Sequence, residues 1–403
     1  MQVIFQTGEL KLYDVVVIGG GPIGSWVAYK LAGMGYEVAA VERKERLGEP
    51  VCCTGIISRE CVDSFAVDES VILRWVNSAR LFLPSGKFLR LWRQEPQAAI
   101  VDRAAFNVAL ASRAQDRGVE YVLNSPVRNI EVGDDGVRIE VVCQGEKLVF
   151  EARVAVIASG FGSTLAEELG LGRVGDSVTG AQAEVEAIGV DEVEVYCGCE
   201  IAPSFFAWLV PTSSGKALVG LLSRRNSGVY LRKLMSSLQA GGKIALEGVE
   251  LSYGGVPLKP LPRTYGERLV VVGTAAGQAK PTTGGGIYYG LLCADIAANN
   301  LHRALKTDDL SVRNLAGYER EWKRKLGREL KTGYWARRFY ELLNDRQVGR
   351  IFDIIESSGI LEALLGAEDL SFDWHGRVVQ RVIGHGVLVK AIEAMKIPFK
   401  PPS

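Results

Sequence analysis

The hydrophobic pattern of the first forty residues predicts a β-α-β unit. Residues 13–18 (Y-D-V-V-V-I) are almost entirely apolar, which is typical of a strand buried on both faces. G-G-G-P-I-G follows at 19–24, and residues 25–35 then show apolar side chains at helical spacing. Residues 37–42 (E-V-A-A-V-E) predict a second strand that ends in a carboxylate. This order of elements is the repeating unit of a parallel α/β sheet.

The rest of the chain alternates between strands, turns and helices, without internal repeats or long linkers. Residues 79–101 alternate around a P-S-G turn, which predicts a hairpin. Residues 180–256 predict several strands of one antiparallel sheet, and from residue 310 the pattern stays helical to the end. The remaining predicted elements are a helix at 103–117, strands at 119–123, 127–142, 153–158 and 268–273, and a helix at 286–305.

Composition and charge narrow the range of functions. The 403 residues contain 47 Lys or Arg and 47 Asp or Glu, and this zero net charge gives no argument for nucleic-acid binding. The seven cysteines are an odd number without a C-x-x-C pair, and with only three histidines they predict no metal site. The sequence shows neither a secretory signal nor an apolar run of membrane-spanning length, so we expect a cytoplasmic protein with reduced cysteines.

The glycine-rich turn at 19–24 has the pattern of a dinucleotide-binding loop. Gly19 permits the tight turn after the strand, Gly21 lets backbone N–H groups approach a pyrophosphate, and Gly24 lets helix and strand pack closely. Glu42, at the end of the second strand, is placed to bond a ribose hydroxyl. Because a strand precedes the loop and a helix follows it, a dinucleotide site is a much stronger interpretation than a plain αβ turn.

Two distant segments indicate that the dinucleotide is FAD. V-D-R-A-A-F-N at 101–107 resembles the D-R-x-x-F segment of p-hydroxybenzoate-hydroxylase-like flavoproteins, which implies that its arginine lies by the flavin nucleotide. V-V-G-T-A-A-G-Q-A-K-P-T-T-G-G-G-I at 271–287 resembles the second flavin motif of that group, where a glycine-rich helix N-terminus faces the flavin. The expected FAD contacts, besides Gly19, Gly21, Gly24 and Glu42, are Arg43, Arg103, Val127, Gly273, Thr274, Gly277, Pro281, Gly284, Gly285, Gly286 and Ile287.

Two residues depart from these flavin motifs. Thr274 replaces the usual aspartate that bonds a ribityl hydroxyl, and Ser159 stands where the pattern A-D-G-x-x-S has its aspartate. Both replacements remove negative charge near the phosphate or ribityl groups of FAD. We expect FAD to bind, but less tightly than the complete motifs imply.

The segment P-V-C-C-T-G-I-I-S at 50–58 narrows the resemblance. It is similar to the P-V-x-C segment of the geranylgeranyl reductase family, which shares the p-hydroxybenzoate hydroxylase fold, and the match places Cys53 at the family's cysteine beside the flavin ring. That family also has an aromatic-x-W-x-F-P segment, followed by a glycine, that lines a lipid tunnel. This chain has F-A-W-L-V-P, with Phe for the usual Tyr and Val for the usual Phe. The resemblance thus implies substrate contacts from Phe206, Trp208, Pro211 and Gly220.

The resemblance implies an enzyme that reduces isolated carbon–carbon double bonds of an isoprenoid chain, with hydride from reduced FAD. An unactivated alkene stabilises no carbanion, so the site needs a dry apolar tunnel and a placed proton source. We expect Cys53 to orient the alkene or to lie on the proton path, while the proton donor stays unassigned. The rivals are a FAD-dependent monooxygenase or halogenase on the same fold, and a non-catalytic prenyl-lipid binding protein. The electron donor stays open among NAD(P)H, a deazaflavin and ferredoxin.

The implied fold is an α/β protein in which a Rossmann-type FAD-binding domain is interleaved with an antiparallel substrate domain. We expect the FAD-binding domain at 1–175 and 261–305, with the hairpin at 79–101 joining the substrate sheet. The substrate domain is expected at 176–260, and a helical C-terminal region at 306–403.

The other cysteines and the basic tail each have a simpler interpretation. Four of the other cysteines are favoured as core residues. The C-G-C at 197–199 could be a redox pair, but a coincidental spacing is favoured, because cysteines two apart on a strand point to the same face and rarely bridge well. Residues 303–350 carry thirteen Lys or Arg against seven Asp or Glu, among aromatic side chains. A solvated helix face is the simplest interpretation. Peripheral contact with the inner membrane surface, or docking of an acidic electron carrier, are the alternatives. The cysteines favoured as core are Cys52, Cys61, Cys143 and Cys293.

Overall fold

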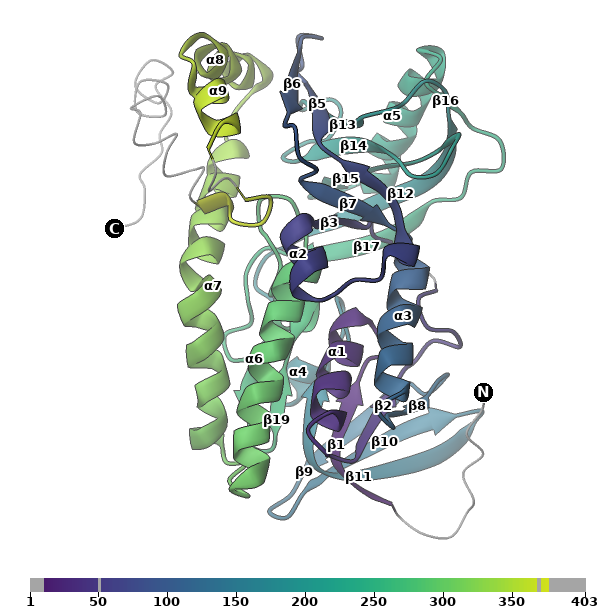
Figure 1. Cartoon of the computed structure of the whole chain (residues 1–403), viewed down its shortest axis with the longest axis vertical. Helices are drawn as coiled ribbons and strands as arrows, with labels where there is room; N and C mark the ends of the chain where they lie inside the picture. Colours follow the sequence, from purple (N-terminus) through teal and green to yellow (C-terminus); the bar gives the residue numbers. More distant parts are fainter. Residues whose placement is uncertain (1–10, 50–51, 368–370, 377–403) are drawn as a thin grey trace.

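Two sheets lie one above the other along the longest axis of the molecule, with a long helix running beside them (Figure 1). The structure is a computed structural model that describes residues 11–49, 52–367 and 371–376. The part of the predicted helical tail at residues 377–403 therefore lies outside the described residues. The α/β class and the helical C-terminal region are confirmed.

The first sheet is built on the predicted β-α-β unit. In its central strand β1, Val15 and Val17 pack into one core cluster while Val16 and Ile18 pack into another, so both faces are buried. This explains the unbroken apolar run of that strand. The neighbouring strands β2, β11 and β19 run parallel to it or to each other, and their carboxyl ends meet at one edge. In spatial order the strands are β18 (Tyr265–Gly266), β19 (Leu269–Val271), β11 (Glu146–Ile157), β1 (Leu12–Ile18), β2 (Val38–Val41) and β8 (Glu120–Val122).

Helices cover one face of this sheet and an antiparallel hairpin covers the other (Figure 1). The single strand expected at 127–142 is wrong: Gly133 N–H donates to the Gly136 carbonyl at 2.8 Å, and this turn splits the segment into two strands. The helices are α1 (Pro22–Ala32), α3 (Arg103–Gln115) and α6 (Ile287–Lys306), and the strands are β9 (Val127–Val132) and β10 (Val137–Cys143), which pairs with β11.

The second sheet contains the strands expected at 180–256, together with the hairpin expected at 79–101. That hairpin is confirmed for residues 78–92, whereas residues 98–101 belong to a separate small sheet. The hairpin pairs with the rest of the second sheet in parallel, so this sheet is not antiparallel throughout. The sheet order is β16 (Ile244–Ala245), β12 (Ser177–Ala187), β15 (Lys216–Ser223), β14 (Phe206–Pro211), β13 (Val193–Cys197), β5 (Ser78–Phe82) and β6 (Phe88–Trp92), with β17 (Ser252–Pro257) also paired to β12.

The prediction of strands alone between 180 and 256 is wrong, because helix α5 (Ser227–Ala240) lies within that segment. Its buried residues Leu231, Leu234, Met235 and Leu238 recur at three- and four-residue intervals and pack on one face of the second sheet. Helix α5 therefore covers one face of the second sheet and leaves the opposite face open to other contacts.

The remaining elements connect the two sheets and complete the C-terminal region. The tail is helical as far as Leu365, but residues 371–374 are irregular, which corrects the expectation of uninterrupted helix. A small sheet joins β3 (Ile56–Ser58), β7 (Ala98–Val101) and β4 (Ile72–Val76), while the further helices are α2 (Arg59–Ser64), α4 (Leu165–Glu168), α7 (Val312–Tyr340), α8 (Asp345–Ser357) and α9 (Ile360–Leu365), with 3-10 turns η1 (Glu69–Val71) and η2 (Gly273–Ala276).

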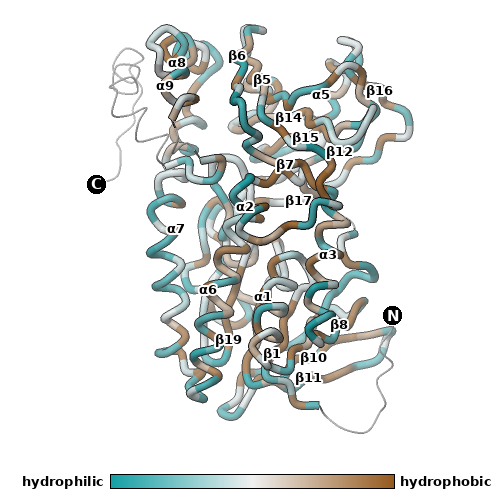
Figure 2. The backbone as a smooth tube through the Cα atoms, viewed as in Figure 1, coloured by the Kyte–Doolittle hydropathy of each residue, from teal (hydrophilic) through white to brown (hydrophobic). Residues whose placement is uncertain are grey.

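Hydropathy follows this layering. Figure 2 shows α7 as largely hydrophilic, whereas strand β7 is largely hydrophobic. In the part of the chain that the structure describes, no helix has the length and apolar character needed to cross a membrane.

Helix α7 is tied to the edge of the first sheet by buried polar contacts. Trp322 is fully buried, and its Nε1 donates a hydrogen bond to Thr264 Oγ1 at 2.9 Å. Glu319 Oε2 accepts from the Thr264 backbone N–H at 2.8 Å, and Tyr318 OH donates to the Val271 carbonyl at 2.9 Å. These contacts fix α7 against the strand that carries the second flavin motif.

Replacing Trp322 by alanine should destabilise the protein, because it leaves a large void between α7 and the sheet. We expect the free energy of unfolding, measured by urea denaturation, to fall by about 3–5 kcal/mol. Trp92→Ala on β6, where the side chain is half exposed, is the matched control and should change it by less than about 1 kcal/mol. Equal losses for the two variants would contradict the anchoring role of Trp322.

Candidate functional site

Each of the three glycines of the predicted dinucleotide loop is suited to its position for a different structural reason. A methyl group at Gly24 would lie 2.0 Å from the Gly19 carbonyl oxygen, so this position requires close packing of helix on strand. Gly19 has a φ of +114°, and a methyl group there would lie 2.4 Å from the Ala158 carbonyl oxygen. Gly21, in contrast, has nothing within 4 Å of the methyl position. It leaves an open cradle at the N-terminus of α1, where free N–H groups favour an anion.

Glu42 is buried at the end of β2 and holds the loop in place. Its Oε2 accepts from the Gly20 backbone N–H at 2.7 Å, and its Oε1 accepts from the Lys44 N–H at 3.0 Å. Its carbonyl accepts from the Ser125 N–H at 2.8 Å, which brings the start of β9, with Val127, to the same edge. Arg43 is exposed beside it. The expected acid, arginine and valine thus gather at the carboxyl end of β2.

Arg103 begins α3 and lies over the segment that carries the adjacent cysteines. A methyl group at Gly55 would lie 2.5 Å from the Val101 carbonyl oxygen and 3.0 Å from Arg103 Cγ. One Arg103 nitrogen, Nη1, donates to Asn107 Oδ1 at 2.8 Å, while its Nε is buried without a hydrogen-bond partner in the described structure. The arginine therefore has a donor left for a ligand beside residues 53–55.

The second flavin motif forms a folded loop between β19 and α6. Gly273 has a φ of +69° and donates its N–H to Gln278 Oε1 at 2.7 Å. Gly277 has a φ of +74°, and a methyl group there would lie 2.4 Å from the Lys259 carbonyl oxygen. Thr274 Oγ1 lies 3.3 Å from the methyl position of Gly286, so its hydroxyl faces the glycine run.

Of the remaining residues of the second flavin motif, one packs against α7 and four line a cavity. Pro281 packs against α7, where its Cδ lies 3.4 Å from the methyl position of Gly333. The expected FAD contacts Gly284, Gly285, Gly286 and Ile287 instead line an apolar cavity beside the second sheet. The motif therefore joins the nucleotide loop, the long helix and the cavity.

The donors around the loop fit FAD. Ser159 Oγ is buried without a hydrogen-bond partner in the described structure, like Arg103 Nε, and both need an acceptor. Gly160 and Gly162, which follow β11, also have nothing within 4 Å of their methyl positions. Hydroxyl, guanidinium and backbone N–H donors around an open cradle suit a pyrophosphate and its sugars.

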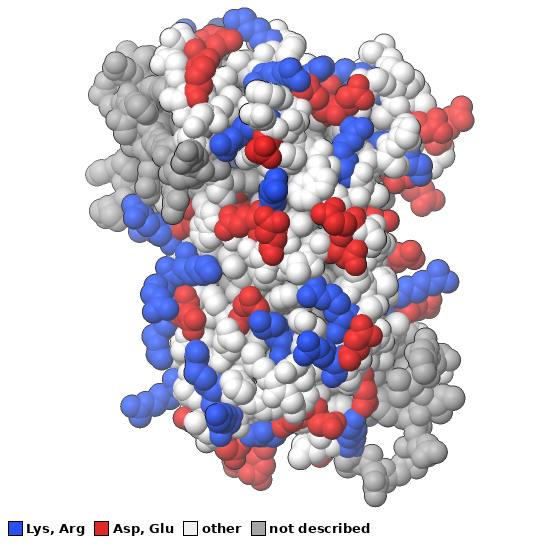
Figure 3. Space-filling view, in the orientation of Figure 1, with Lys and Arg blue, Asp and Glu red and all other residues white. Residues whose placement is uncertain are grey.

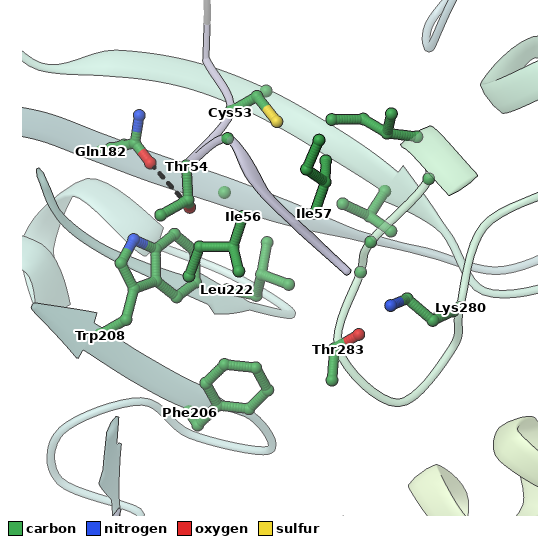
Figure 4. A pocket seen from close by; sticks show the side chains of 18 of the residues that line it. Cys53, Thr54, Ile56, Ile57, Gln182, Phe206, Trp208, Leu222, Lys280 and Thr283 are labelled. Atoms are coloured by element: carbon green, nitrogen blue, oxygen red, sulfur yellow. Dashed lines mark hydrogen bonds between the residues drawn. The ribbon is translucent and has the colours of Figure 1, made fainter. Parts of the chain in front are cut away.

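A cavity of about 480 Å³ lies between the uncovered face of the second sheet and the glycine run (Figure 4). Its walls are mainly apolar, and its volume is in the range of small-molecule sites. Segments far apart in the sequence meet at this cavity, among them the P-V-x-C segment and the second flavin motif. The lining consists of residues 52–57, 180–182, 254–256 and 283–288 with Ala79, Leu91, Val193, Val195, Phe206, Trp208, Leu222, Lys280, Phe372 and Asp373.

Cys53 and Cys52 both line the cavity and are both half-buried. Their segment is fixed to the second sheet because Thr54 Oγ1 donates to Gln182 Oε1 at 3.0 Å (Figure 4). Cys52 packs against β17, with its Sγ 3.3 Å from the methyl position of Gly254. Burial raises the pKa of the Cys52 thiol, which therefore stays protonated near neutral pH.

Phe206 and Trp208 reach the cavity because they alternate along β14. Their neighbours Ala207 and Leu209 point to the opposite face and pack in the α5 core. Trp208 is paired across the strands with Gly220, and a methyl group at Gly220 would lie 2.6 Å from the indole ring. The glycine thus makes room for the tryptophan, whose Nε1 is buried without a partner in the described structure.

Two of the four expected substrate residues lie outside the cavity wall. Neither Pro211 nor Gly220 is part of its lining, although both are on the strands that carry it. Gly220 acts on the cavity through Trp208, and direct substrate contact by Pro211 stays a prediction.

The sequence reasoning missed Lys280, Phe372 and Asp373, which also line the cavity. A charged residue inside the otherwise uncharged second flavin motif was a signal for Lys280. Asp373 had none, because only the folded chain brings the irregular segment at 371–374 to the glycine run. Lys280 and Asp373 are the charged residues of this lining.

The other cysteines form no additional site. All seven are free thiols. The core interpretation is confirmed for Cys61 and Cys293, which are buried, and burial raises the pKa of both thiols. It is wrong for Cys52, which lines the cavity, and for Cys143, which is only half-buried. In the C-G-C segment Cys197 is buried and Cys199 exposed, so the two thiols have different surroundings.

Comparisons with known proteins agree with this geometry. A family model described as lycopene cyclase protein matches residues 14–363. The digeranylgeranylglycerophospholipid reductase of Methanocaldococcus jannaschii is 29% identical over 359 residues, covering 86% of this chain and 91% of that protein. Digeranylgeranylglycerophospholipid reductase 1 of Methanopyrus kandleri is 31% identical over 385 residues, covering 90% of this chain and 100% of that protein.

Solved structures show the same fold. A geranylgeranyl bacteriochlorophyll reductase-like protein of Thermoplasma acidophilum superposes with a TM-score of 0.84 at 23% identity, covering 96% of this chain and 99% of that one. The p-nitrophenol 4-monooxygenase of Pseudomonas putida is less similar, with a TM-score of 0.72 at 17% identity, covering 97% and 99%. The chain belongs to the family that the lycopene cyclase model describes and, by its relatives, to the geranylgeranyl reductase family of FAD-dependent oxidoreductases.

Proposed function

We propose that this protein reduces carbon–carbon double bonds in the isoprenoid chains of a geranylgeranyl-type lipid. The observation that carries the proposal is the convergence of Cys53, Trp208 and the glycine run 284–286 on one apolar cavity. The reductase relatives support the lipid as substrate, and a digeranylgeranylglycerophospholipid is the proposed form.

The chain's own residues suit this task. Phe206, Trp208 and Leu222 offer an apolar surface to a hydrocarbon chain and keep water from the reacting carbons. The loop at 19–24, with Arg103 and Ser159, would hold the nucleotide part of FAD, and residues 284–287 would face its ring. FAD supplies the hydride when bound and reduced. Cys53 is proposed to orient the alkene from the wall opposite the glycine run.

A cyclase is the second candidate, because a lycopene cyclase model matches the chain. Ring closure of an isoprenoid leaves its chemical formula unchanged, whereas reduction adds two hydrogen atoms per bond. Product mass therefore separates the two candidates. A monooxygenase or halogenase would instead add an oxygen or halogen atom, and its structural relative is the more distant one.

Gly21→Ala should weaken FAD binding without disturbing the fold. The methyl group would enter the open cradle at the start of α1, where nothing lies within 4 Å, and would obstruct the pyrophosphate. We expect the Kd for FAD, measured by quenching of flavin fluorescence, to rise at least about tenfold. Gly175→Ala, at an exposed position with equally open surroundings, is the matched control and should leave the Kd unchanged. Unchanged affinity in the Gly21 variant would place the nucleotide elsewhere.

The function is tested by substrate-driven reoxidation of the flavin. Protein reduced with dithionite without oxygen is mixed with a digeranylgeranylglycerophospholipid, so the assay does not depend on the natural electron donor, which we propose is external. We expect the flavin absorbance to return as the lipid mass rises by about two units per bond, the mass of the added hydride and proton. Cys53→Ala should slow this step at least about tenfold, because a misplaced alkene reacts poorly. Cys52→Ala, the adjacent cavity thiol, should not.

Unchanged lipid mass, or equal effects of the two cysteine variants, would count against the proposal. Unchanged mass with a new product would favour the cyclase. A protein that cannot be loaded with FAD would favour lipid binding without catalysis.

We also propose that the outer face of α7 meets an anionic membrane surface. Figure 3 shows Lys and Arg gathered along this helix, and the exposed ones include Arg320, Arg324, Lys325, Arg328 and Lys331. Each basic residue near such a surface contributes about 1 kcal/mol of attraction. Such a contact would bring the protein to the bilayer in which its proposed lipid substrate resides.

Charge reversal on α7 should reduce vesicle binding. We expect the triple variant Arg324→Glu, Arg328→Glu, Lys331→Glu to bind vesicles with anionic lipid at least about tenfold more weakly in a sedimentation assay. The matched control reverses Arg128, Arg232 and Lys233, which are exposed on other elements, and should bind as the original protein does. Equal loss in both variants would indicate an effect of net charge alone.

A further inference from the structure

A buried ion pair stands at the glycine-run end of the apolar cavity. Lys280 Nζ lies 2.6 Å from Asp373 Oδ1, and the two side chains are 6% and 2% exposed. Both residues line the cavity, and in Figure 4 the amine of Lys280 points from its loop toward the cavity interior. Removing two charges from water is costly, so a pair in an otherwise apolar site needs a reason other than stability.

The loop and its neighbours hold this pair in one place. The Lys280 backbone N–H donates to the Gly285 carbonyl at 3.0 Å, and its carbonyl accepts from the Gly284 N–H at 2.8 Å. Lys280 Cε lies 2.7 Å from the methyl position of Gly285, so only glycine there leaves room for the lysine stem. On the other side, Tyr289 OH donates to the Asp373 carbonyl at 2.8 Å. The ammonium is therefore positioned, not merely enclosed.

Lys280 can donate a proton, and Asp373 has an oxygen free to accept one. An ammonium has three N–H groups. In the described structure they have two acceptors, Asp373 Oδ1 and, at 3.5 Å, the Phe372 carbonyl. At least one N–H is left for the cavity. Asp373 Oδ2 is buried without a hydrogen-bond partner in the described residues, so the carboxylate can take up another proton.

Two hydroxyl groups on the cavity wall are engaged elsewhere, whereas the unpartnered Trp208 Nε1 belongs to an uncharged indole ring. The Tyr288 hydroxyl donates to Glu60, and burial together with that hydrogen bond raises the pKa of Tyr288. The Thr54 hydroxyl donates to Gln182. Lys280 is thus the lining residue whose charged donor faces the place where an alkene would lie.

We propose that Lys280 is the proton donor of the reduction and that Asp373 is its positioning residue. The proposal rests on the reductase function and assigns the proton source that the chemistry requires. The Nζ–H bond breaks with its electron pair left on nitrogen, and the π pair of the alkene forms the new C–H bond. The other alkene carbon takes the hydride that the reductase function supplies. Lys280 is left as a neutral amine, and solvent returns its proton through Asp373.

Two variants separate proton donation from a structural role. Lys280→Arg keeps the positive charge and the partner for Asp373, but a guanidinium is not deprotonated in proteins. The double variant Lys280→Ala with Asp373→Asn leaves no unpaired buried charge and keeps the test valid if arginine is too large for the site. Lys306→Met, at an exposed position, is the control.

The measurement is the rate of flavin reoxidation by the lipid, with FAD content and lipid affinity of the oxidised protein measured alongside. We expect both variants to keep FAD and lipid affinity and to lose at least about 100-fold in rate. Ethylamine added to the double variant should restore part of the rate, which a purely structural role of Lys280 does not predict.

The outcomes distinguish this inference from the function on which it rests. The assignment of Lys280 is overturned if the flavin of the Lys280→Arg variant is reoxidised within threefold of the original rate. It is also overturned if the double variant reaches that rate without added amine. Either result would leave the proposed reductase function standing. Absence of reoxidation in the unaltered, FAD-loaded protein overturns the proposed function, and the inference falls with it.

Discussion

The site depends on the contact between the two sheets, where a polar edge and an apolar face share one space. The carboxyl ends of β1, β2, β11 and β19 meet at the edge of the first sheet, and the chain must turn there within a few residues. Glycines allow those turns and the close approach of backbones, as at Gly24, where a methyl group would lie only 2.0 Å from the Gly19 carbonyl oxygen. The face of the second sheet that α5 does not cover supplies the apolar wall. The cavity therefore combines the glycine run at the edge of the first sheet with the apolar face of the second.

Short-range patterns were enough to predict much of this arrangement. The apolar run of β1 is a local signal that produces the buried strand it predicts. The glycine spacing at 19–24 and the acid at residue 42 are local signals too, and the structure joins them through the Glu42–Gly20 hydrogen bond, while their contacts with FAD stay predictions. The alternation F-A-W-L on β14 likewise decides which side chains face the cavity. Family resemblance then joined segments that no local pattern connects, such as Cys53 with the glycine run. Their roles in binding and catalysis stay proposals, although the fold brings them together.

What the sequence did not reveal depends on contacts between distant residues. Parallel pairing of β5 with β13 joins residues more than a hundred positions apart, and hairpin signals say nothing about it. Helix α5 was missed because its apolar residues were taken for strand alternation. Asp373 meets Lys280 only because the tail returns over the glycine run. The ionic part of the site therefore emerged only with the fold, while its apolar part was visible in the sequence.

The central claim is that the isoprenoid chain lies in the cavity between Cys53, Trp208 and the glycine run. Photocrosslinking tests it most directly, with a geranylgeranyl phospholipid that carries a diazirine on its chain and peptide mass spectrometry to locate the label. The account predicts label on residues 52–57 and on Phe206 or Trp208, reduced by competition with unmodified lipid. Label confined to the outer face of α7, with none on the cavity wall, would contradict it.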